Sequence, residues 1–220
     1  MDKVKVRLAS VTPNYQELLM LACSKPYGKD VTMKGVKRIV DSGHLSVLEH
    51  CYASFEVDES TRVLGQFTRH RHKSFTVKSA RGSEFNEVVI PQRIEDKIRE
   101  KVRINNPHFC DEQVENAVRS EKEKLSHRAM ELYREFLDEG FPHEDAAYFL
   151  PEGVLTSKLV TGNMRAWYEY LPKRLCKRAM PEHRKLAEMI HEELRKAVPE
   201  IFDRDFMPCE HCKEHSCEFH

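Results

Sequence analysis

The chain has 220 residues, of which 40% are hydrophobic and 33% are charged, and its 36 Lys and Arg are balanced by 36 Asp and Glu. This length is enough for one sizeable domain with its own core. The zero net charge argues against a dedicated nucleic-acid-binding protein, which normally carries a basic excess. No stretch is apolar enough to span a bilayer, and the start, MDKVKVRLAS, lacks the apolar core of a signal peptide. We therefore expect a cytoplasmic protein with no membrane partner.

Strand-like and helix-like patterns follow one another along the chain. Val4, Val6 and Leu8 alternate with charged residues, which predicts a half-buried first strand. The pair Thr12-Pro13 is typical of a helix start, so we expect a helix over roughly 13–23. Further helices are expected over about 32–41, 60–72, 163–173 and 180–197, further strands over about 50–57, 88–90 and 154–160, a mostly helical segment over 92–140, and a short helix in HEDAAYFLP.

These patterns predict an α+β fold with one domain over residues 1–202. We expect a mixed sheet with flanking helices in this domain. No internal repeat and no linker interrupts it. A short Cys- and His-rich C-terminal tail over 203–220 follows the domain.

The stretch from Arg69 to Arg81 reads RHRHKSFTVKSAR and begins at the end of a predicted helix. Guanidinium groups are always charged and grip phosphate or carboxylate with two parallel hydrogen bonds. Such a cluster is costly to place inside a fold unless an anion or a polar ligand meets it. We expect the stretch to run into a loop, where its side chains can converge on a ligand. The alternative interpretation is a solvated basic run or a nucleic-acid patch.

The motif Arg69-His70-Arg71, followed after seven residues by Ser79, resembles the signature of the flavin-dependent thymidylate synthases, the ThyX family. Gln66 stands where that family has a glutamine. Other segments resemble the family in the same order along the chain: His44-x-Ser46-x-x-Glu49-His50, FLPEGVLTSKLVTGNMR, Leu171-Pro172-Lys173-Arg174 and Ala179-x-x-Glu182-x-Arg184.

The resemblance implies an enzyme that moves a one-carbon unit from methylenetetrahydrofolate to C5 of dUMP, with NADPH reducing FAD, and gives dTMP. The implied flavin-binding residues are Ser46, Arg69, His70, Arg71, Asn163 and Arg165. The implied nucleotide-binding residues are Gln66, Arg69, Ser79, Arg81 and Arg174. The family forms homotetramers whose flavin sites draw on several subunits, so a homotetramer is implied here.

Arg174 is the predicted catalytic residue. A fixed cation beside the uracil ring stabilises negative charge as it develops there. The alternative interpretation of Arg174 is an arginine in a surface salt bridge.

Several positions depart from the family pattern. Thr76 and Val77 stand where Asn-Glu is usual, and Ala147 stands where a phosphate-gripping arginine is expected. Glu169 replaces an asparagine and Arg178 replaces a histidine. Three neighbouring cations could compensate, namely Lys78, Lys173 and Arg178. Otherwise the chain is a paralogue that acts on another pyrimidine nucleotide or transfers a different one-carbon product. A third hypothesis is a non-enzymatic nucleic-acid-binding protein with a zinc tail.

The tail carries Cys209-x-x-Cys212-x4-Cys217 together with interleaved histidines. Zinc in proteins prefers four thiolate and imidazole ligands in a tetrahedron. We predict a zinc site formed by Cys209, Cys212, Cys217 and His215. The alternative is a disordered polar tail, because only one CxxC half is present.

Overall fold

The structure, a computed structural model, describes residues 3–207, 209, 212, 214 and 217–218. The chain divides into two compact units. The first, which we call the helical unit, comprises Met1–Val4, Asp58–Gly65 and Val77–Ser157. The second, which we call the sheet unit, comprises Lys5–Val57, Gln66–Thr76 and Lys158–His220.

Four strands form one sheet in the order β1-β2-β4-β3, and most of their residues belong to the sheet unit. The strands are β1 (Lys5–Val11), β2 (Tyr52–Ser60), β3 (Lys73–Val77) and β4 (Leu155–Asn163). In every neighbouring pair a hydrogen bond joins the end of one strand to the start of the other. These bonds run from Thr12 N to Tyr52 O (3.0 Å), from Met164 N to Cys51 O (2.8 Å) and from Lys78 N to Ser157 O (2.9 Å).

The predicted α+β class is therefore confirmed, and the sheet is antiparallel rather than mixed. Parallel neighbours require a crossover that returns the chain to the same end of the sheet. Here, in each pair of neighbouring strands, the end of one strand lies beside the start of the other, so the two strands run in opposite directions.

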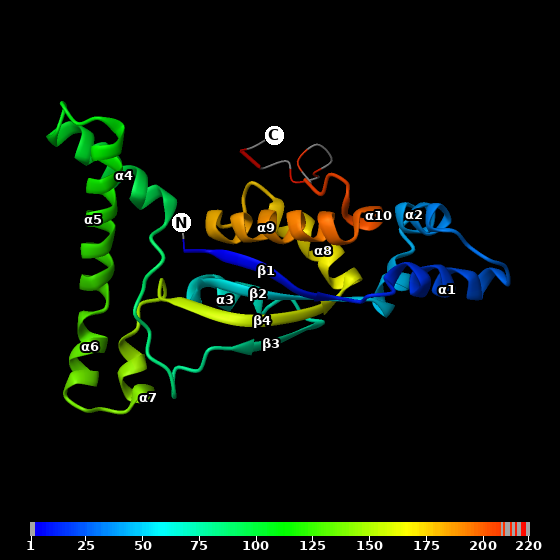
Figure 1. The fold of residues 1–220 in the computed structure, drawn as a ribbon, viewed down its shortest axis with the longest axis horizontal. Helices are drawn as coiled ribbons and strands as arrows, with labels where there is room; N and C mark the ends of the chain where they lie inside the picture. The colour runs from blue at the N-terminus through cyan, green and yellow to red at the C-terminus, as the bar shows by residue number, and fades with distance from the viewer. Residues whose placement is uncertain (1–2, 208, 210–211, 213, 215–216, 219–220) are drawn as a thin grey trace. The chain divides into compact units, whose positions relative to one another are not determined.

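The helices of the sheet unit are α1 (Tyr15–Tyr27), α2 (Met33–Asp41), α8 (Met164–Leu175), α9 (Pro181–Ala197) and α10 (Pro199–Phe202), with a 3-10 turn, η1 (Leu45–His50). Helix α9 packs on β1 and on α8, as Figure 1 shows. Trp167 of α8 is fully buried, and its Nε1 donates to Ala53 O and to Gly162 O, each at 3.1 Å. These bonds fix α8 against the strands that carry the two carbonyl groups.

Short polar side chains cap the starts of three of the helices. Thr32 Oγ1 accepts from Gly35 N at 3.4 Å, and Asn163 Oδ1 accepts from Ala166 N at 2.8 Å. Ser60 Oγ accepts from Val63 N at 3.2 Å and starts α3 (Thr61–Phe67). Each bond satisfies a backbone N–H that has no partner inside its helix.

The stretch after Arg69-His70-Arg71 differs from the expected loop. Helix α3 ends at Phe67 rather than near residue 72, and Lys73 begins β3. His72 has a φ of 65°, in the left-handed region, which turns the chain from the helix end toward the strand. Residues 73–77, the middle of the stretch, therefore have a fixed backbone along an edge of the sheet.

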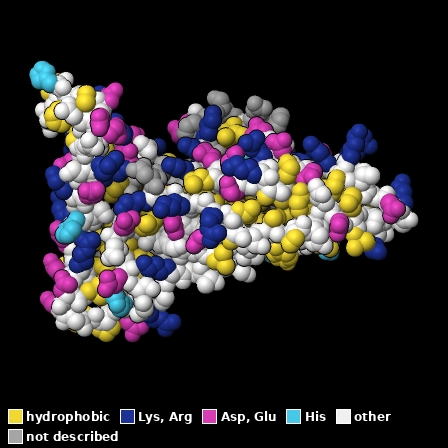
Figure 2. Space-filling model, viewed as in Figure 1, with side chains coloured by type: hydrophobic (Ala, Val, Ile, Leu, Met, Phe, Trp, Pro, Cys, Tyr) yellow, Lys and Arg dark blue, Asp and Glu magenta, His cyan; other side chains and the backbone are white. Residues whose placement is uncertain are grey.

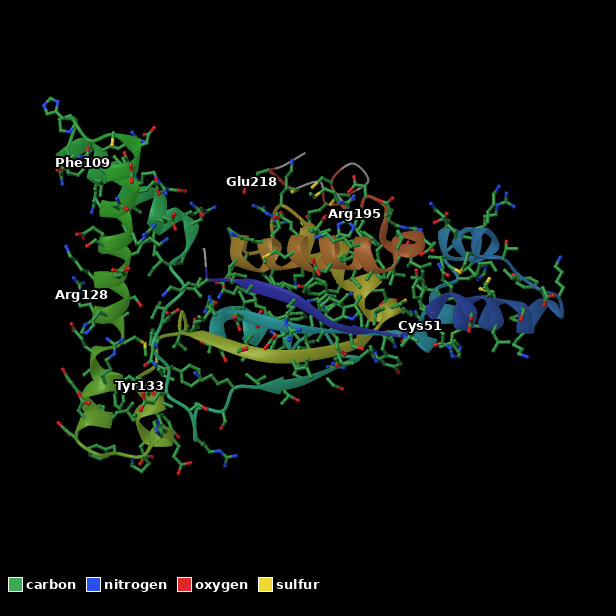
Figure 3. The ribbon with its side chains drawn as sticks, in the orientation of Figure 1. Cys51, Phe109, Arg128, Tyr133, Arg195 and Glu218 are labelled. Carbon is green, nitrogen blue, oxygen red and sulfur yellow. The ribbon has the colours of Figure 1, made fainter. Side chains whose placement is uncertain are left out.

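The helical unit contains α4 (Gln92–Asn105), α5 (Asp111–Ala129), α6 (Glu131–Asp138), α7 (His143–Ala146) and a 3-10 turn, η2 (Ala147–Phe149). Tyr133 of α6 lies in its core, and its hydroxyl oxygen accepts from Phe85 N at 3.2 Å (Figure 3). Val88 forms a single β-bridge with Val154, so the strand expected over 88–90 is wrong. One reason is that Val88 N donates to the Ser126 hydroxyl at 3.1 Å instead of to a strand.

Charges of both signs are interspersed over the face shown in Figure 2. No helix in the described part of the chain is long and apolar enough to cross a membrane.

Candidate functional site

Arg174 lies at the centre of a polar network in the sheet unit. Its Nε donates to His70 Nε2 at 2.8 Å, its Nη1 donates to Gln66 Oε1 at 3.2 Å, and its Nη2 donates to Gln66 O at 3.4 Å. Within the described residues Arg174 forms no ion pair with a carboxylate. The structure thus brings together three of the predicted site residues, of which Arg174 lies more than 100 positions from His70 and Gln66 in the sequence.

The contact with Arg174 fixes the protonation of His70. An arginine can only donate, so His70 Nε2 must carry a lone pair. Burial, and then the charges of Arg174, Lys73 and Lys173, lower the pKa of His70 to about 4. At neutral pH His70 is therefore an uncharged acceptor that orients the guanidinium group.

His183 of α9 completes this network and was not predicted from the sequence. The side chain is fully buried, and its Nδ1 lies 3.4 Å from Gln66 Oε1. Burial, and then the charges of Arg174, His70 and Lys158, lower the pKa of His183 to about 2. Because Gln66 Oε1 can only accept, Nδ1 carries the proton, and the buried Nε2 has no hydrogen-bond partner among the described residues.

A signal for His183 exists in the sequence. Leu186, Ala187 and Ile190 follow it at spacings of three, four and seven, which places the imidazole on the apolar face of α9. A polar group on such a face needs a buried partner. That partner, Gln66, is 117 positions away and cannot be identified from local periodicity.

A cavity of about 300 Å³ in the sheet unit is lined by part of this network. Its lining includes Arg69, His70, Arg71, Lys73 and Lys173, and one acid, Glu169. The Oε1 atom of Glu169 accepts from Arg165 Nε at 2.8 Å. The lining therefore has an excess of positive charge, which suits an anionic ligand.

The other predicted flavin residues surround α8 and η1. Asn163 Oδ1 caps α8, and Arg165 Nη1 donates to Glu49 Oε1 of η1 at 2.6 Å. Ser46 is an exposed residue of the same turn, and η1 packs on α8. Through its bonds to Glu49 and Glu169, Arg165 thus connects η1, the turn that carries Ser46, to the cavity lining.

Two predicted nucleotide-binding residues, Ser79 and Arg81, belong to the helical unit. Both are exposed, and Arg81 N donates to Ser79 Oγ at 3.2 Å. Val77 and Ala147, the positions that depart from the family pattern, also belong to this unit.

The predicted zinc ligands lie in the tail. Cys209, Cys212 and Cys217 are described by the structure, while His215 lies outside the described residues. Among the residues that the structure describes, no group of three or more His, Cys, Asp and Glu side chains is arranged to hold a metal ion. The zinc site stays a prediction.

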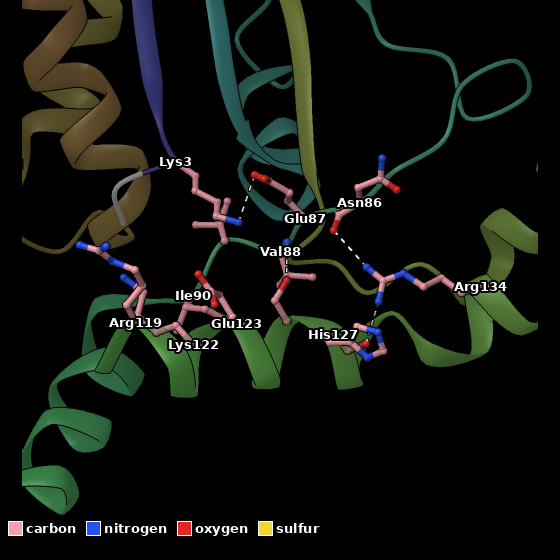
Figure 4. Close-up of a pocket in the computed structure, with 12 residues that line it drawn as sticks. Lys3, Asn86, Glu87, Val88, Ile90, Arg119, Lys122, Glu123, His127 and Arg134 are labelled. Carbon is pink, nitrogen blue, oxygen red and sulfur yellow. Dashed lines mark hydrogen bonds and ion pairs between the residues drawn. The ribbon is translucent and has the colours of Figure 1, made fainter. Parts of the chain in front are cut away.

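A larger cavity, of about 430 Å³, lies in the helical unit between the 86–90 segment and α5 (Figure 4). None of the predicted site residues lines it. Several of its charged side chains already have partners: Lys3 pairs with Glu87 at 3.1 Å, and Arg134 Nη2 donates to Asn86 O at 3.3 Å. The cavity in the sheet unit, with its clustered cations, is therefore the better candidate for an anionic ligand.

Comparisons with known proteins identify the family of this chain. The family model described as thymidylate synthase complementing protein matches residues 7–200. A flavin-dependent thymidylate synthase of Saccharolobus solfataricus is 30% identical over 216 residues, which cover 90% of this chain and 75% of the relative. One of Thermococcus onnurineus is 32% identical over 211 residues, covering 89% and 80%. A probable flavin-dependent thymidylate synthase of Mycobacterium phage D29 is 33% identical over 180 residues, covering 76% and 70%. The chain therefore belongs to the thymidylate synthase complementing protein family, which confirms the resemblance to the flavin-dependent thymidylate synthases.

Proposed function

We propose that this protein is a flavin-dependent thymidylate synthase. It transfers a one-carbon unit from methylenetetrahydrofolate to C5 of dUMP and gives dTMP, with FAD as cofactor and NADPH as reductant. The observation that carries the proposal is the network of Gln66, His70 and Arg174, part of which lines a cavity rich in cations. The names of the relatives support the same assignment. We further propose a cytoplasmic homotetramer, as the family resemblance implies.

The donors that line the cavity fit the phosphate groups of FAD. Arg69, Arg71 and Lys173 offer guanidinium and ammonium donors, which bind phosphate oxygens strongly. The volume of about 300 Å³ is at the small end of the range for ligand pockets, so the cavity suits part of a dinucleotide. The residues that would hold FAD are Ser46, Arg69, His70, Arg71, Asn163 and Arg165. When bound, FAD supplies the redox chemistry, and the protein supplies orientation and electrostatics.

The residues that would hold the nucleotide are Gln66, Arg69, Ser79, Arg81 and Arg174, as the family resemblance implies. Arg174 is held in one orientation by His70 and Gln66, so its charge is fixed before the substrate binds. A preoriented cation stabilises the negative charge that develops on the pyrimidine without reorganising during the reaction.

The flavin assignment is tested by the double variant His70→Ala, Arg71→Ala. We expect the wild-type protein to take up FAD, and the double variant to bind it about ten- to a hundredfold more weakly, because two polar contacts in the cavity lining are lost. FAD affinity is measured by fluorescence titration. The FAD-loaded wild-type protein is then assayed for dTMP formation from dUMP, methylenetetrahydrofolate and NADPH.

A matched control is the variant His127→Ala, Arg128→Ala, which removes an adjacent His-Arg pair from the exposed face of α5. It should bind FAD like the wild type. Equal FAD affinity in the wild type and the His70/Arg71 variant would contradict the assigned flavin site. Absence of dTMP formation by FAD-loaded protein would contradict the proposed activity.

The zinc prediction is tested by metal analysis. If Cys209, Cys212, Cys217 and His215 bind zinc, the protein purified without chelator should contain about one Zn per chain. Truncation after Phe206 should remove the metal and leave FAD affinity unchanged, because no predicted flavin residue lies in the tail. A metal-free full-length protein would show that the tail is not a zinc site.

A further inference from the structure

Lys73, the first residue of β3, is one of the residues that line the cavity of the sheet unit. Its Nζ donates to Ala166 O at 2.8 Å and lies 4.6 Å from the ring centroid of Trp167. Gly162 of β4 leaves space for the stem of this lysine, since a Cβ at Gly162 would lie 3.0 Å from Lys73 Cγ and 3.3 Å from Trp167 Nε1. The surroundings are thus shaped to hold the lysine side chain in one place.

The charges around Lys73 are mostly of its own sign. The segment before β3 contributes four residues to the cavity lining, namely Arg69, His70, Arg71 and His72. Helix α8 contributes the titratable residues Glu169, Tyr170 and Lys173. Within the described residues no carboxylate forms an ion pair with Lys73 Nζ, and Glu169 is already paired with Arg165 at 2.8 Å. Burial, and then the charge of Lys173, lower the pKa of Lys73 to about 7, against an opposing effect of Glu169.

An ammonium group that is desolvated among like charges is costly unless an anion meets it. Of its three N–H donors, one is used by Ala166 O, and the ring faces of Trp167 and Tyr170, at 4.6 and 5.2 Å, are weaker partners than an oxygen anion. A phosphate oxygen in the cavity would accept from the remaining donors and neutralise the charge.

We propose that Lys73 is a further ligand-binding residue of this site, whose ammonium group donates to a phosphate group of the bound flavin or nucleotide. This inference rests on the proposed function, because that function supplies the phosphate. FAD and dUMP both carry phosphate groups, so the experiment tests each of them as a separate ligand. Lys73 lies between the Arg-His-Arg motif and Ser79 and is not among the residues that the family resemblance assigns.

The proposal predicts a particular dependence of affinity on pH. A bound phosphate favours the charged form of Lys73 and raises its pKa above the value of about 7 in the free protein. Above about pH 7 binding must therefore take up a proton, and affinity must fall by about tenfold or more between about pH 7 and pH 9. Over this range a phosphate monoester is already mostly dianionic, since its second pKa is about 6. His70 is uncharged throughout, because its pKa is about 4.

The test is calorimetric titration of the full-length protein with FAD, dUMP and inorganic pyrophosphate as three separate ligands. Wild type, Lys73→Met and Lys73→Arg are compared at about pH 7, 8 and 9, in buffers of different ionisation enthalpy that report proton uptake. At pH 7 Lys73→Met should bind the phosphate-bearing ligand about ten- to a hundredfold more weakly than the wild type does. Its affinity should not change between about pH 7 and pH 9. Lys73→Arg should keep the affinity and lose the pH dependence, because arginine stays charged.

The ligand whose affinity shows both effects, the weaker binding by Lys73→Met and the lost pH dependence in Lys73→Arg, is the one whose phosphate contacts Lys73. Lys196→Met is the matched control, because Lys196 is exposed on α9 and pairs with Glu193 at 3.2 Å. It should behave like the wild type. If Lys73→Met fails to fold, as judged by its circular dichroism, Lys73→Arg decides alone through the loss of the pH dependence.

The proposal is overturned if Lys73→Met matches the wild type with every ligand, or if Lys73→Arg shows the wild-type pH dependence. Pyrophosphate binding that depends on Lys73, in a protein that binds neither FAD nor dUMP, would support the anion contact and contradict the proposed function. Binding of none of the three ligands would overturn both.

Discussion

Replacement of Arg174 by lysine is expected to lower kcat for dTMP formation by about 10²- to 10³-fold, the size of effect seen when a preoriented donor to developing negative charge is lost. Lysine keeps the positive charge but not the planar arrangement of donors. Three different nitrogens of Arg174 bond to His70 Nε2, Gln66 Oε1 and Gln66 O. One ammonium group cannot reach all three acceptors in the same geometry, so the cation loses its fixed orientation.

The measurement is steady-state kinetics with dUMP as the varied substrate. A larger effect on kcat than on KM indicates that Arg174 acts on the transition state more than on substrate binding. Arg195→Lys is the matched control, because Arg195 lies exposed on α9 and its Nη2 donates to Glu192 Oε2 at 2.9 Å on the same helix. If Arg174→Lys keeps kcat close to that of Arg195→Lys, the catalytic role of Arg174 is wrong.

Acidification is expected to destabilise the fold through His183. In the folded protein the pKa of His183 is lowered to about 2 from an ordinary value of 6.5, first by burial and then by Arg174. The unfolded chain therefore binds the proton more tightly than the folded chain. The stabilisation from neutral His183 is complete above about pH 6.5 and is lost as the pH falls, by up to about 1.4 kcal/mol per pH unit. His70, with a pKa of about 4, adds to the loss in the same direction.

Urea unfolding at several pH values between about 7 and 4.5 measures this slope. His183→Leu should be less stable at neutral pH, because Gln66 loses a donor, and its stability should fall less steeply with acid. The control His108→Leu, at an exposed position of the helical unit, should keep the wild-type slope. Identical slopes for the wild type and His183→Leu would show that His183 is not held neutral by the fold.

The elements whose signals are local could be predicted from the sequence alone. The alternation near the N-terminus, the capping side chains Thr32 and Ser60, and the apolar spacing of α9 depend on residues a few positions apart. Such patterns report helical or strand periodicity and the hydrogen bonds of helix ends. The Arg69-His70-Arg71 motif likewise indicated the candidate site, because clustered guanidinium groups favour a nearby anion.

The positions at which the helices of the 92–140 segment break depend on tertiary packing. In one continuous helix the spacing of Ala129, Leu132 and Tyr133 would place all three on one apolar face and so predict three core residues. The chain instead breaks between α5 and α6 at Met130, which is buried together with Tyr133, while the Leu132 side chain is 56% exposed. The break changes the rotational phase of α6, and its position depends on packing against Phe85 and Val154.

The contacts within the candidate site also depend on tertiary packing. Strand β3 exists because it pairs with β4, and Lys73 is held there by Ala166, which is 93 positions away. His70 and Arg174 are 104 positions apart, and His183 meets Gln66 across 117. Local periodicity carries no information about which distant residues pair, because strand pairing and buried polar contacts are selected by the packing of the whole fold.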